Sequence, residues 1–432
     1  MERQVTHAAQ GHVLTNINVW SPDSRWIAYD TRTGDAFNGT RIEEVNVGTG
    51  ERRLLYESRN GANCGVVTRD PTSTRVVFIH GPEHPDASWS YGFTRRRGAT
   101  ADTQHPGVAH PLDAMNYAPP FAAGAVRGGS HVHVFSPDGQ WVSFTYEDEV
   151  LARLDATAGS ASHDQNQRAI GVAVPAGPVR VARTHPRSHD GDWFSVVVAR
   201  TVNSPRAGSD EISRAFEEGW VGREGYVKND GTKQKRALAF LGTVATGEGK
   251  THHEVFLADL PEDLTRTGSA PLGGTETTRP APPRGVTQRR LTFTGERKFP
   301  GVVTAPRHWL RSSPDGAQIA FLMKDDSGVV QFWTVSPRDG VCLQLTHNAS
   351  DITSTFTWSP DGRWLAHTLD GSVGVTEIAT GKFHRLTPKS SGLGAPRPEA
   401  VVFSPDGKQI AYLRDVTMGA EAFSQIFVIP AL

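Results

Sequence analysis

Ser136-Pro137-Asp138-Gly139 decides the fold, because the same tetrapeptide returns along the chain. Further full copies begin at Ser313, Ser359 and Ser404, and a variant reads Ser21-Pro22-Asp23-Ser24. Each copy lies between a short apolar run and an alternating run, which predicts a strand, a tight turn and a second strand. Proline presets φ at the second turn position, and glycine closes the turn without steric cost. The last three copies stand 46 and 45 residues apart, the length of a four-stranded propeller blade.

Two degenerate copies fill the gaps between the clear turns. Asp70-Pro71-Thr72-Ser73 precedes a run ending in Phe78, and His189-Asp190-Gly191-Asp192 precedes a run starting at Trp193. Turns are therefore expected near residues 22, 71, 137, 189, 314, 360 and 405. Seven turns predict an all-β protein, a seven-bladed β-propeller in which residues 1–432 form a single ring.

The two ends of the chain predict how the ring closes. Residues 425–429 have the pattern of a third blade strand with no fourth strand after it. Residues 3–7 resemble the fourth strands of other blades. We therefore expect the N-terminal strand to complete the last blade, which removes exposed sheet edges.

Two stretches break the blade rhythm and are expected to be insertions, at about residues 86–128 and 203–288. Within the second, residues 209–218 have acidic residues near their start and Gly219 after them, which predicts a short helix. Long insertions in a regular ring usually shape a binding face or a lid.

Composition narrows the classes of partner. The 432 residues carry a formal net charge of −1, so the sequence indicates neither a nucleic-acid nor an anionic-membrane footprint. No apolar stretch is long enough to span a bilayer, and residues 1–7 lack the apolar core of a signal peptide. Cys64 and Cys342 are the only cysteines, so a cytoplasmic protein with reduced thiols is expected.

The inner strand of each blade starts at the central channel, and the turn prolines locate that start. The residues six positions before each proline form a column: Asn16, His131, His308, Ser354 and Glu399, with Gly65 and Arg183 in the degenerate blades. Strand alternation places His133 with His131, and Asn18 with Asn16. His131, His133, His308 and Glu399 are a plausible set of ligands for a divalent transition metal. The alternatives are plain polarity of a water-filled channel and direct contact with a substrate.

Residues 78–89, Phe-Ile-His-Gly-Pro-Glu-His-Pro-Asp-Ala-Ser-Trp, form a second candidate site. His80 ends a strand beside the channel mouth, where an imidazole could act as general base. In the alternative interpretation, His80 and His84 only cap a loop. Arg97, in the run Arg95-Arg96-Arg97, could bind a carboxylate, although a solvated charge run gives the same pattern. The predicted substrate-binding residues are Asn16, Asn18, His84, His185, Arg183 and Arg307.

These runs resemble a family of bacterial propeller proteins that carries only a domain-of-unknown-function label. The resemblance rests on residues 78–86, 128–137 and 208–212 and extends over nearly the whole chain. That family in turn resembles the oligogalacturonate lyases, which are seven-bladed, manganese-dependent and cytoplasmic. More loosely, it is similar to the TolB-type propellers, which share the Ser-Pro-Asp-Gly turns.

The lyase resemblance implies roles for particular residues. The segment around His80 resembles the lyase run that carries the catalytic base, and the segment around His131 and His133 resembles a metal-binding run. Residues 303–309 keep one histidine, His308, where the lyases have two. Glu399 or His185 would have to supply the missing ligand of a Mn²⁺ ion.

The resemblance implies a metal-dependent lyase that cleaves uronate-containing oligosaccharides by β-elimination. In that reaction a cation neutralises the uronate carboxylate while His80 removes the adjacent proton. Two alternatives stand beside it. One is a non-catalytic propeller that binds a protein or sugar at the centre of its ring, and the other is a metal-dependent sugar hydrolase or epimerase.

Overall fold

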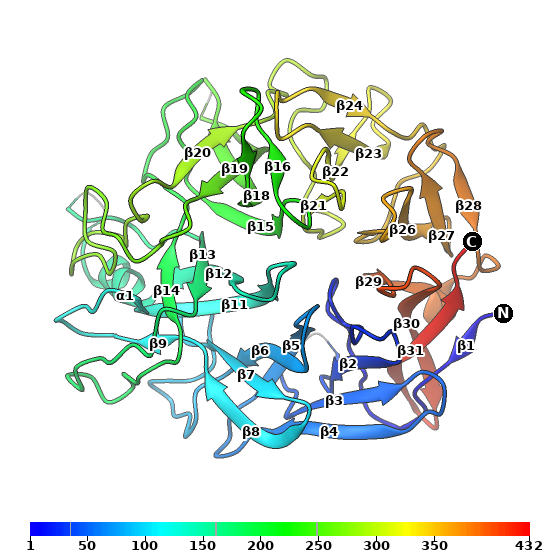
Figure 1. Ribbon diagram of the computed structural model, residues 1–432, viewed down its shortest axis with the longest axis horizontal. Coiled ribbons are helices and arrows are strands. Elements are labelled where there is room, and N and C mark those ends of the chain that lie inside the picture. Colours follow the sequence, from blue (N-terminus) through cyan, green and yellow to red (C-terminus); the bar gives the residue numbers. More distant parts are fainter. Residues whose placement is uncertain (35, 160–161, 248) are drawn as a thin grey trace.

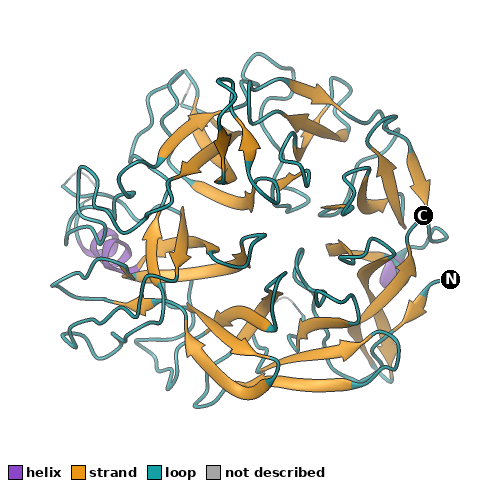
Figure 2. Cartoon of the chain, viewed as in Figure 1, coloured by secondary structure: helices purple, strands orange, loops and turns teal. Residues whose placement is uncertain are grey.

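A computed structural model describes residues 1–34, 36–159, 162–247 and 249–432. Its strands form seven sheets of three or four strands, arranged as blades around a common centre (Figure 1). Strands and loops make up almost all of the drawn chain (Figure 2). The seven-bladed β-propeller predicted from the repeated turns is confirmed.

In the first blade, residues 13–20 take the innermost position through isolated bridges to β2 (Trp26–Asp30), and β3 (Arg41–Asn46) and β4 (Arg52–Glu57) follow outward. From the innermost to the outermost strand, the second blade is β5 (Cys64–Arg69), β6 (Arg75–His80), β7 (Arg97–Asp102) and β8 (His105–Pro111). The third is β11 (Gly128–Phe135), β12 (Val142–Asp148), β13 (Ala169–Val174) and β14 (Phe194–Val197), and the following blades are given in the same order. The fourth and fifth are β15 (Ala215–Trp220), β18 (Arg236–Ala245), β19 (Thr251–Leu260) and β20 (Thr287–Arg290); and β21 (Arg311–Ser312), β22 (Ile319–Lys324), β23 (Val330–Val335) and β24 (Cys342–Gln344). The sixth and seventh are β25 (Thr357–Trp358), β26 (Trp364–Leu369), β27 (Ser372–Glu377) and β28 (Phe383–Arg385); and β29 (Pro396–Phe403), β30 (Gln409–Met418), β31 (Glu421–Pro430) and β1 (Arg3–Gln4).

The remaining elements lie outside the blades. They are the parallel pair β9 (Ala114–Met115) and β10 (Ala125–Val126), the hairpin of β16 (Tyr226–Val227) and β17 (Lys233–Gln234), the helix α1 (Glu149–Thr157) and a 3₁₀ turn, η1 (Gly392–Gly394).

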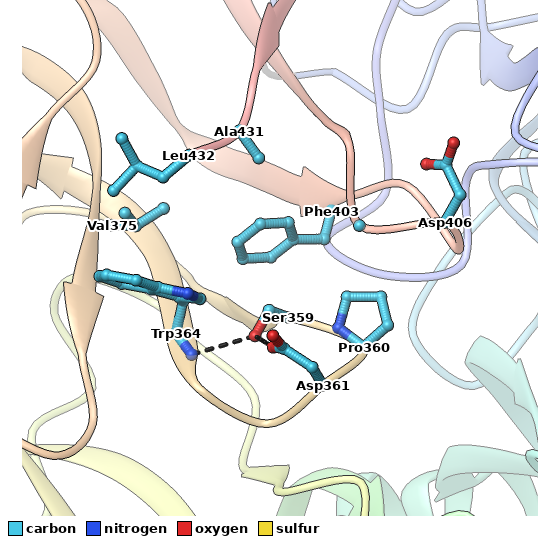
Figure 3. A pocket seen from close by; sticks show the side chains of 10 residues that line it. Ser359, Pro360, Asp361, Trp364, Val375, Phe403, Asp406, Ala431 and Leu432 are labelled. Atoms are coloured by element: carbon cyan, nitrogen blue, oxygen red, sulfur yellow. Dashed lines mark hydrogen bonds between the residues drawn. The ribbon is translucent and has the colours of Figure 1, made fainter.

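Each Ser-Pro-Asp-Gly turn is held by its serine hydroxyl. In the sixth blade, Ser359 Oγ donates to Asp361 Oδ1 at 2.5 Å and accepts the backbone N–H of Trp364 at 3.0 Å (Figure 3). The same pair of bonds recurs in the turns that begin at Ser136, Ser313 and Ser404. The hydroxyl therefore ties the turn to the second residue after it and fixes the register of the following strand.

The inner strands all run from one face of the ring to the other. The Ser-Pro-Asp-Gly turns lie at their ends, on what we call the turn face. The second strands return and end on the opposite face, where His80 closes β6, so we call it the His80 face. Indole groups connect neighbouring blades near the turn face: Trp20, Trp220 and Trp358 each donate Nε1–H to an inner-strand carbonyl of the adjoining blade, at 2.8–3.1 Å.

The N-terminal strand occupies the outermost position of the last blade. Arg3 pairs with Val428 and Gln4 with Phe427 in an antiparallel register. Val5 is buried next to this strand, and its N–H donates to the carbonyl of Ile426 at 2.8 Å. The first and last segments of the chain therefore share one sheet, as the sequence predicted.

The sequence placed the fourth blade wrongly, although it counted seven. Residues 194–197 form β14, the outer strand of the third blade, and no blade turn lies near residue 189. The fourth blade starts at Ala215, and the hairpin β16–β17 replaces its Ser-Pro-Asp-Gly turn. Residues 203–288 therefore contain a whole blade, and residues 86–128 contain the outer strands β7 and β8. Neither stretch is simply an insertion.

The predicted helix at residues 209–218 is wrong. Residues 215–220 form the inner strand β15, whose register shifts between Phe216 and Gly219. The α-helix of the described residues is α1, which follows β12 directly. Its N-cap is Asp148, whose side chain accepts the N–H of Leu151 at 2.9 Å.

Several inner strands contain a bulge that the sequence pattern did not reveal. Val66, Val132 and Glu217 have φ values of 58°, 54° and 56°, and the register shifts at each of these positions. A bulge adds one residue to a strand and re-aims the side chains that follow it. Simple alternation along these strands therefore fails close to the centre of the ring.

The turn glycines allow a direct test of the fold. Gly316 and Gly407 have φ values of 74° and 73°, so alanine at either position is strained by about 1 kcal/mol. A Cβ on Gly316 would also lie 2.1 Å from the carbonyl oxygen of Gly225, whereas the nearest atom to one on Gly407 is 3.5 Å away. We expect Gly316→Ala to lower the free energy of unfolding by a further amount of about 1–3 kcal/mol, measured by urea denaturation. Equal losses in the two variants would contradict the observed contact between the β15–β18 connection and the fifth blade.

Candidate functional site

A cavity of about 270 Å³ opens on the His80 face of the second blade. His80 is the last residue of β6 and Arg97 the first of β7, and the two pair across the ladder. The loop after His80 and a loop from the third blade complete the lining, which includes Glu83, His84, Tyr117 and His189. The cavity therefore joins the two residues that the sequence predicted as catalytic.

His80 is buried, and both of its ring nitrogens have partners. Nδ1 lies 2.7 Å from the carbonyl oxygen of Gly81, so it carries the proton and donates. Nε2 is then the basic atom, and the hydroxyl of Tyr56 donates to it at 2.9 Å. Burial, followed by the positive charge of Arg97, lowers the pKa of His80 to about 4. The imidazole is therefore neutral at pH 7, and its basic lone pair is already oriented by a hydrogen bond.

Arg97 is a cation with few partners. Its Nη1 donates to Nε2 of His189 at 3.0 Å, and its Nη2 lies 3.8 Å from Glu83 Oε1. Its buried Nε has no hydrogen-bond partner within the part of the chain that the structure describes. Burial lowers the pKa of Arg97, and the charge of Glu83 opposes that effect. Guanidinium donors of this kind are suited to a carboxylate supplied by a ligand.

Arg187 holds the loop that forms one wall of the cavity. Its guanidinium donates to the carbonyl oxygens of Glu83 and His84 at 2.7 and 3.0 Å and to Asp86 at 2.8 Å. His84 sits at a φ of 47°, so the loop bends sharply there. Sequence reasoning missed Arg187 and His189 as site residues, because it interpreted residues 189–192 as a blade turn and the residues before them as an inner strand.

Two further predicted substrate-binding residues lie in the same connection between β13 and β14. His185 packs against the rings of Trp89 and Tyr117, with centroids 5.3 and 5.5 Å away. Arg183 donates to the carbonyl of Ser188 at 2.6 Å and pairs with Asp190 at 3.2 Å. His185 thus lies beside the cavity wall, whereas the guanidinium of Arg183 is occupied within its own loop.

His133 belongs to a buried polar network between the second and third blades. Its Nε2 lies 3.0 Å from Ser130 Oγ, which donates to Asp113 at 2.5 Å. Ser195 and the backbone N–H of Gly98 also donate to Asp113, at 2.7 and 3.0 Å. Burial works to raise the pKa of Asp113, but the hydrogen bonds outweigh burial and hold it below its usual value. The bulge at Val132 breaks the alternation that was expected to place His133 beside His131.

The predicted metal ligands are not assembled into a metal site. Among residues 1–34, 36–159, 162–247 and 249–432, no three histidine, cysteine or acidic side chains are grouped as a cation would require. His308 Nε2 accepts the N–H of Leu322 at 3.2 Å and its Nδ1 donates to the carbonyl of Pro306 at 3.1 Å, so neither nitrogen is available. Glu399 is paired with Arg397 at 2.6 Å. The predicted Mn²⁺ site therefore does not fit these residues.

His131 lies within reach of the charges of three arginines. Burial, and then three guanidinium groups, hold the pKa of His131 well below its ordinary value; these belong to Arg96, Arg168 and Arg307. Arg168 is paired with Glu147 and Arg307 with Glu217, so Arg96 is the one cation of the three without an ion pair in the described residues.

The other predicted residues lie along the centre of the ring. Asn16 accepts a hydrogen bond from Arg311 of the fifth blade, which confirms that inner-strand residues far apart in sequence meet there. Arg307 pairs with Glu217 at 2.9 Å. Asn18 lines a different cavity, of about 520 Å³, on the turn face.

The fold defines a class, the seven-bladed propellers, and solved oligogalacturonate lyases are similar to this chain in shape. A solved oligogalacturonate lyase in complex with manganese matches 100% of this chain and 93% of its own, with a TM-score of 0.56 and 11% identity. The oligogalacturonate lyase of Vibrio parahaemolyticus matches 99% and 93%, with a TM-score of 0.57 and 9% identity. At these identities the likeness shows the fold alone.

A curated sequence relative identifies the family. The "Uncharacterized protein YidR" of Escherichia coli (strain K12) is 47% identical over 415 residues, which cover 95% of this chain and 94% of that protein. Residues 63–189 match the model described as "Protein of unknown function (DUF3748)", a range that contains all the residues given for the cavity lining. The chain belongs to this family. No helix in the described residues is long and apolar enough to cross a membrane.

Glu218, on the inner strand β15, provides a pH-dependent test of the described burial near the centre of the ring. It is buried and accepts a hydrogen bond from Thr145 at 2.8 Å, and burial raises its pKa from 4.5 to about 7. Its contribution to stability is complete below pH 4.5 and is lost as pH rises through about 7. The difference in free energy of unfolding between the natural protein and Glu218→Gln is followed with pH. It should change by about 2 kcal/mol between pH 5.5 and 8, because only the natural protein loses stability. The control Glu262→Gln, at an exposed site, should show no such change, and a pH-independent Glu218→Gln difference would contradict the assignment.

Proposed function

We propose that this protein is a lyase that cleaves uronate-containing oligosaccharides by β-elimination in the cavity between His80 and Arg97. The fold of the oligogalacturonate lyases supports the proposal over the full chain. The cavity supports it locally, because it sets a neutral imidazole beside guanidinium groups. Free thiols at Cys64 and Cys342 support a reducing, cytoplasmic location.

The observation that carries the proposal is the incomplete pairing of Arg97. A partly buried guanidinium with one neutral acceptor and a carboxylate 3.8 Å away leaves favourable interactions unmade. A uronate carboxylate placed against the free N–H donors of Arg97 would provide the missing hydrogen bonds and ion pair. The same contact would spread the negative charge that builds on the carboxylate when the neighbouring proton leaves.

His80 supplies the base in the proposed reaction. Nε2 takes the proton from the carbon next to the carboxylate, after the substrate has displaced the Tyr56 hydroxyl. The electron pair of that C–H bond forms the new carbon–carbon double bond, the glycosidic C–O bond breaks, and the departing oxygen takes a proton from water. The products are an unsaturated uronide and a shortened sugar.

Substrate binding would also strengthen the base. The charge of Arg97 is the second cause of the low pKa of His80, after burial. A carboxylate bound to Arg97 offsets that charge and raises the affinity of Nε2 for a proton. The pair therefore acts together: the group that binds the acid also tunes the group that removes its neighbouring proton.

A second candidate function is a non-catalytic module that binds a protein or sugar at the centre of the ring. The observation in its favour is the turn-face cavity of about 520 Å³, whose walls are prolines of the repeated turns and the indoles of Trp20, Trp220 and Trp358. Sugar binding without any unsaturated product would favour this function over the lyase.

His80 can be tested by activity. His80→Gln should lower the rate of formation of the absorbing unsaturated product from a uronate oligomer by about 100-fold or more, because the base is lost. His110→Gln, at an exposed position on β8 of the same blade, serves as the matched control and should stay active. Circular dichroism establishes that both variants are folded. Full activity in a folded His80→Gln would exclude His80 from the chemistry.

The pH dependence provides an independent check. Because the pKa of free His80 is about 4, kcat/KM should stay level from pH 8 to about 5 and fall only as pH approaches 4. The profile is measured at constant ionic strength. A fall centred near pH 6.5 would indicate an ordinary, exposed histidine and would contradict the described environment of His80.

A further inference from the structure

Arg96 lines the same cavity as the proposed catalytic pair and also contacts the innermost strand of the third blade. Its backbone carbonyl accepts the N–H of Ser130 at 3.1 Å. Ser130 directly precedes His131 on the inner strand β11, so Arg96 lies against the start of that strand. Arg95 and Arg97 are engaged elsewhere, with Glu149 at 3.0 Å and with His189. Arg96 therefore connects the cavity at His80 with the centre of the ring.

Arg96 is a buried cation without a matching anion. Only 6% of it is exposed, its Nη1 donates to the Tyr91 hydroxyl at 2.9 Å, and its guanidinium lies 5.2 Å from the ring of Phe93. It forms no ion pair with a carboxylate in the described ranges, and its buried Nε has no partner there. Burying such a charge unpaired is costly, so a bound anion would stabilise it.

His131, which follows the Ser130 that contacts Arg96, is a second side chain with an unused hydrogen-bonding atom. It is 4% exposed, and its buried Nδ1 has no hydrogen-bond partner among the residues with described positions. Two of the cations around it are already neutralised, since Arg168 pairs with Glu147 at 2.7 Å and Arg307 with Glu217 at 2.9 Å. The remaining charge is that of Arg96.

We propose that Arg96 and His131 form an anion subsite at the centre of the ring, which binds a carboxylate of an acidic oligosaccharide without a metal ion. The inference rests on the proposed function and deepens it, because it assigns a cationic protein group to a position where the fold relatives suggested a metal. With Arg97 in the adjoining cavity, the site would bind two acidic groups. It would therefore prefer an acidic oligomer to a single uronic acid.

Calorimetric titration of the full chain with digalacturonate, in buffer with EDTA, tests the subsite. We expect binding without added metal and a loss of affinity of about tenfold or more in Arg96→Gln, since a charge-assisted hydrogen bond is removed. Arg25→Gln, exposed on the turn face, is the matched control. His131→Gln, which keeps a polar side chain, is the second variant and should also weaken binding. It provides the test if Arg96→Gln does not fold.

The outcomes separate the subsite from the reaction. Digalacturonate binding that requires Mn²⁺, or binding unchanged in folded Arg96→Gln and His131→Gln, would overturn the subsite even if the natural protein forms unsaturated product. Binding that depends on Arg96, in a protein that never forms that product, would support the subsite and contradict the lyase proposal.

Discussion

The serine hydroxyl of the Ser-Pro-Asp-Gly turn is the contact on which the ring depends. It donates to the turn aspartate and accepts the N–H of the residue that starts the next strand, so turn geometry and strand register are fixed together. Because side chains alternate along a strand, a slip of one residue would move its apolar set out of the core between blades. Because the same contact recurs in several blades, their strands have the same register. The inner strands therefore lie around one centre, and the second strands end on the His80 face.

Charge pairing at that face explains the proposed chemistry. Near the centre, Arg168 and Arg307 have carboxylate partners, and the buried Arg311 is hydrogen-bonded to Asn16. Arg96 is buried and has no ion pair in the described structure, and the partly buried Arg97 has only the carboxylate of Glu83, at 3.8 Å. A protein keeps such groups only where something compensates for them, and a ligand carboxylate does so directly.

The sequence predicted the fold better than the site. The turns report on local geometry, so repetition alone gave seven blades and the pairing of the two ends. The fourth blade was misplaced because the hairpin β16–β17 stands where its turn would be, and β15 was read as a helix from its acidic residues. His80 and Arg97 could be found because they flank one strand connection. His189 and Arg187 could not, because only tertiary packing brings their loop to the second blade.

Within the described residues the predicted metal ligands do not come together, for a reason specific to inner strands. Counting back from the turn prolines assumes unbroken alternation, and the bulge at Val132 turns His133 into the core beside Asp113. His308 is likewise occupied by backbone groups. The sequence pattern located residue types that can bind a metal. It did not reveal the directions in which their side chains point, and those directions decide whether they can bind one ion together.

A crystal structure of the protein with bound digalacturonate would test the central claim most directly. The account predicts one carboxylate on the guanidinium of Arg97 with the adjacent C–H directed at His80 Nε2, and the second carboxylate on Arg96. A disaccharide bound instead on the turn face, or bound through a metal ion held by His131, would contradict it.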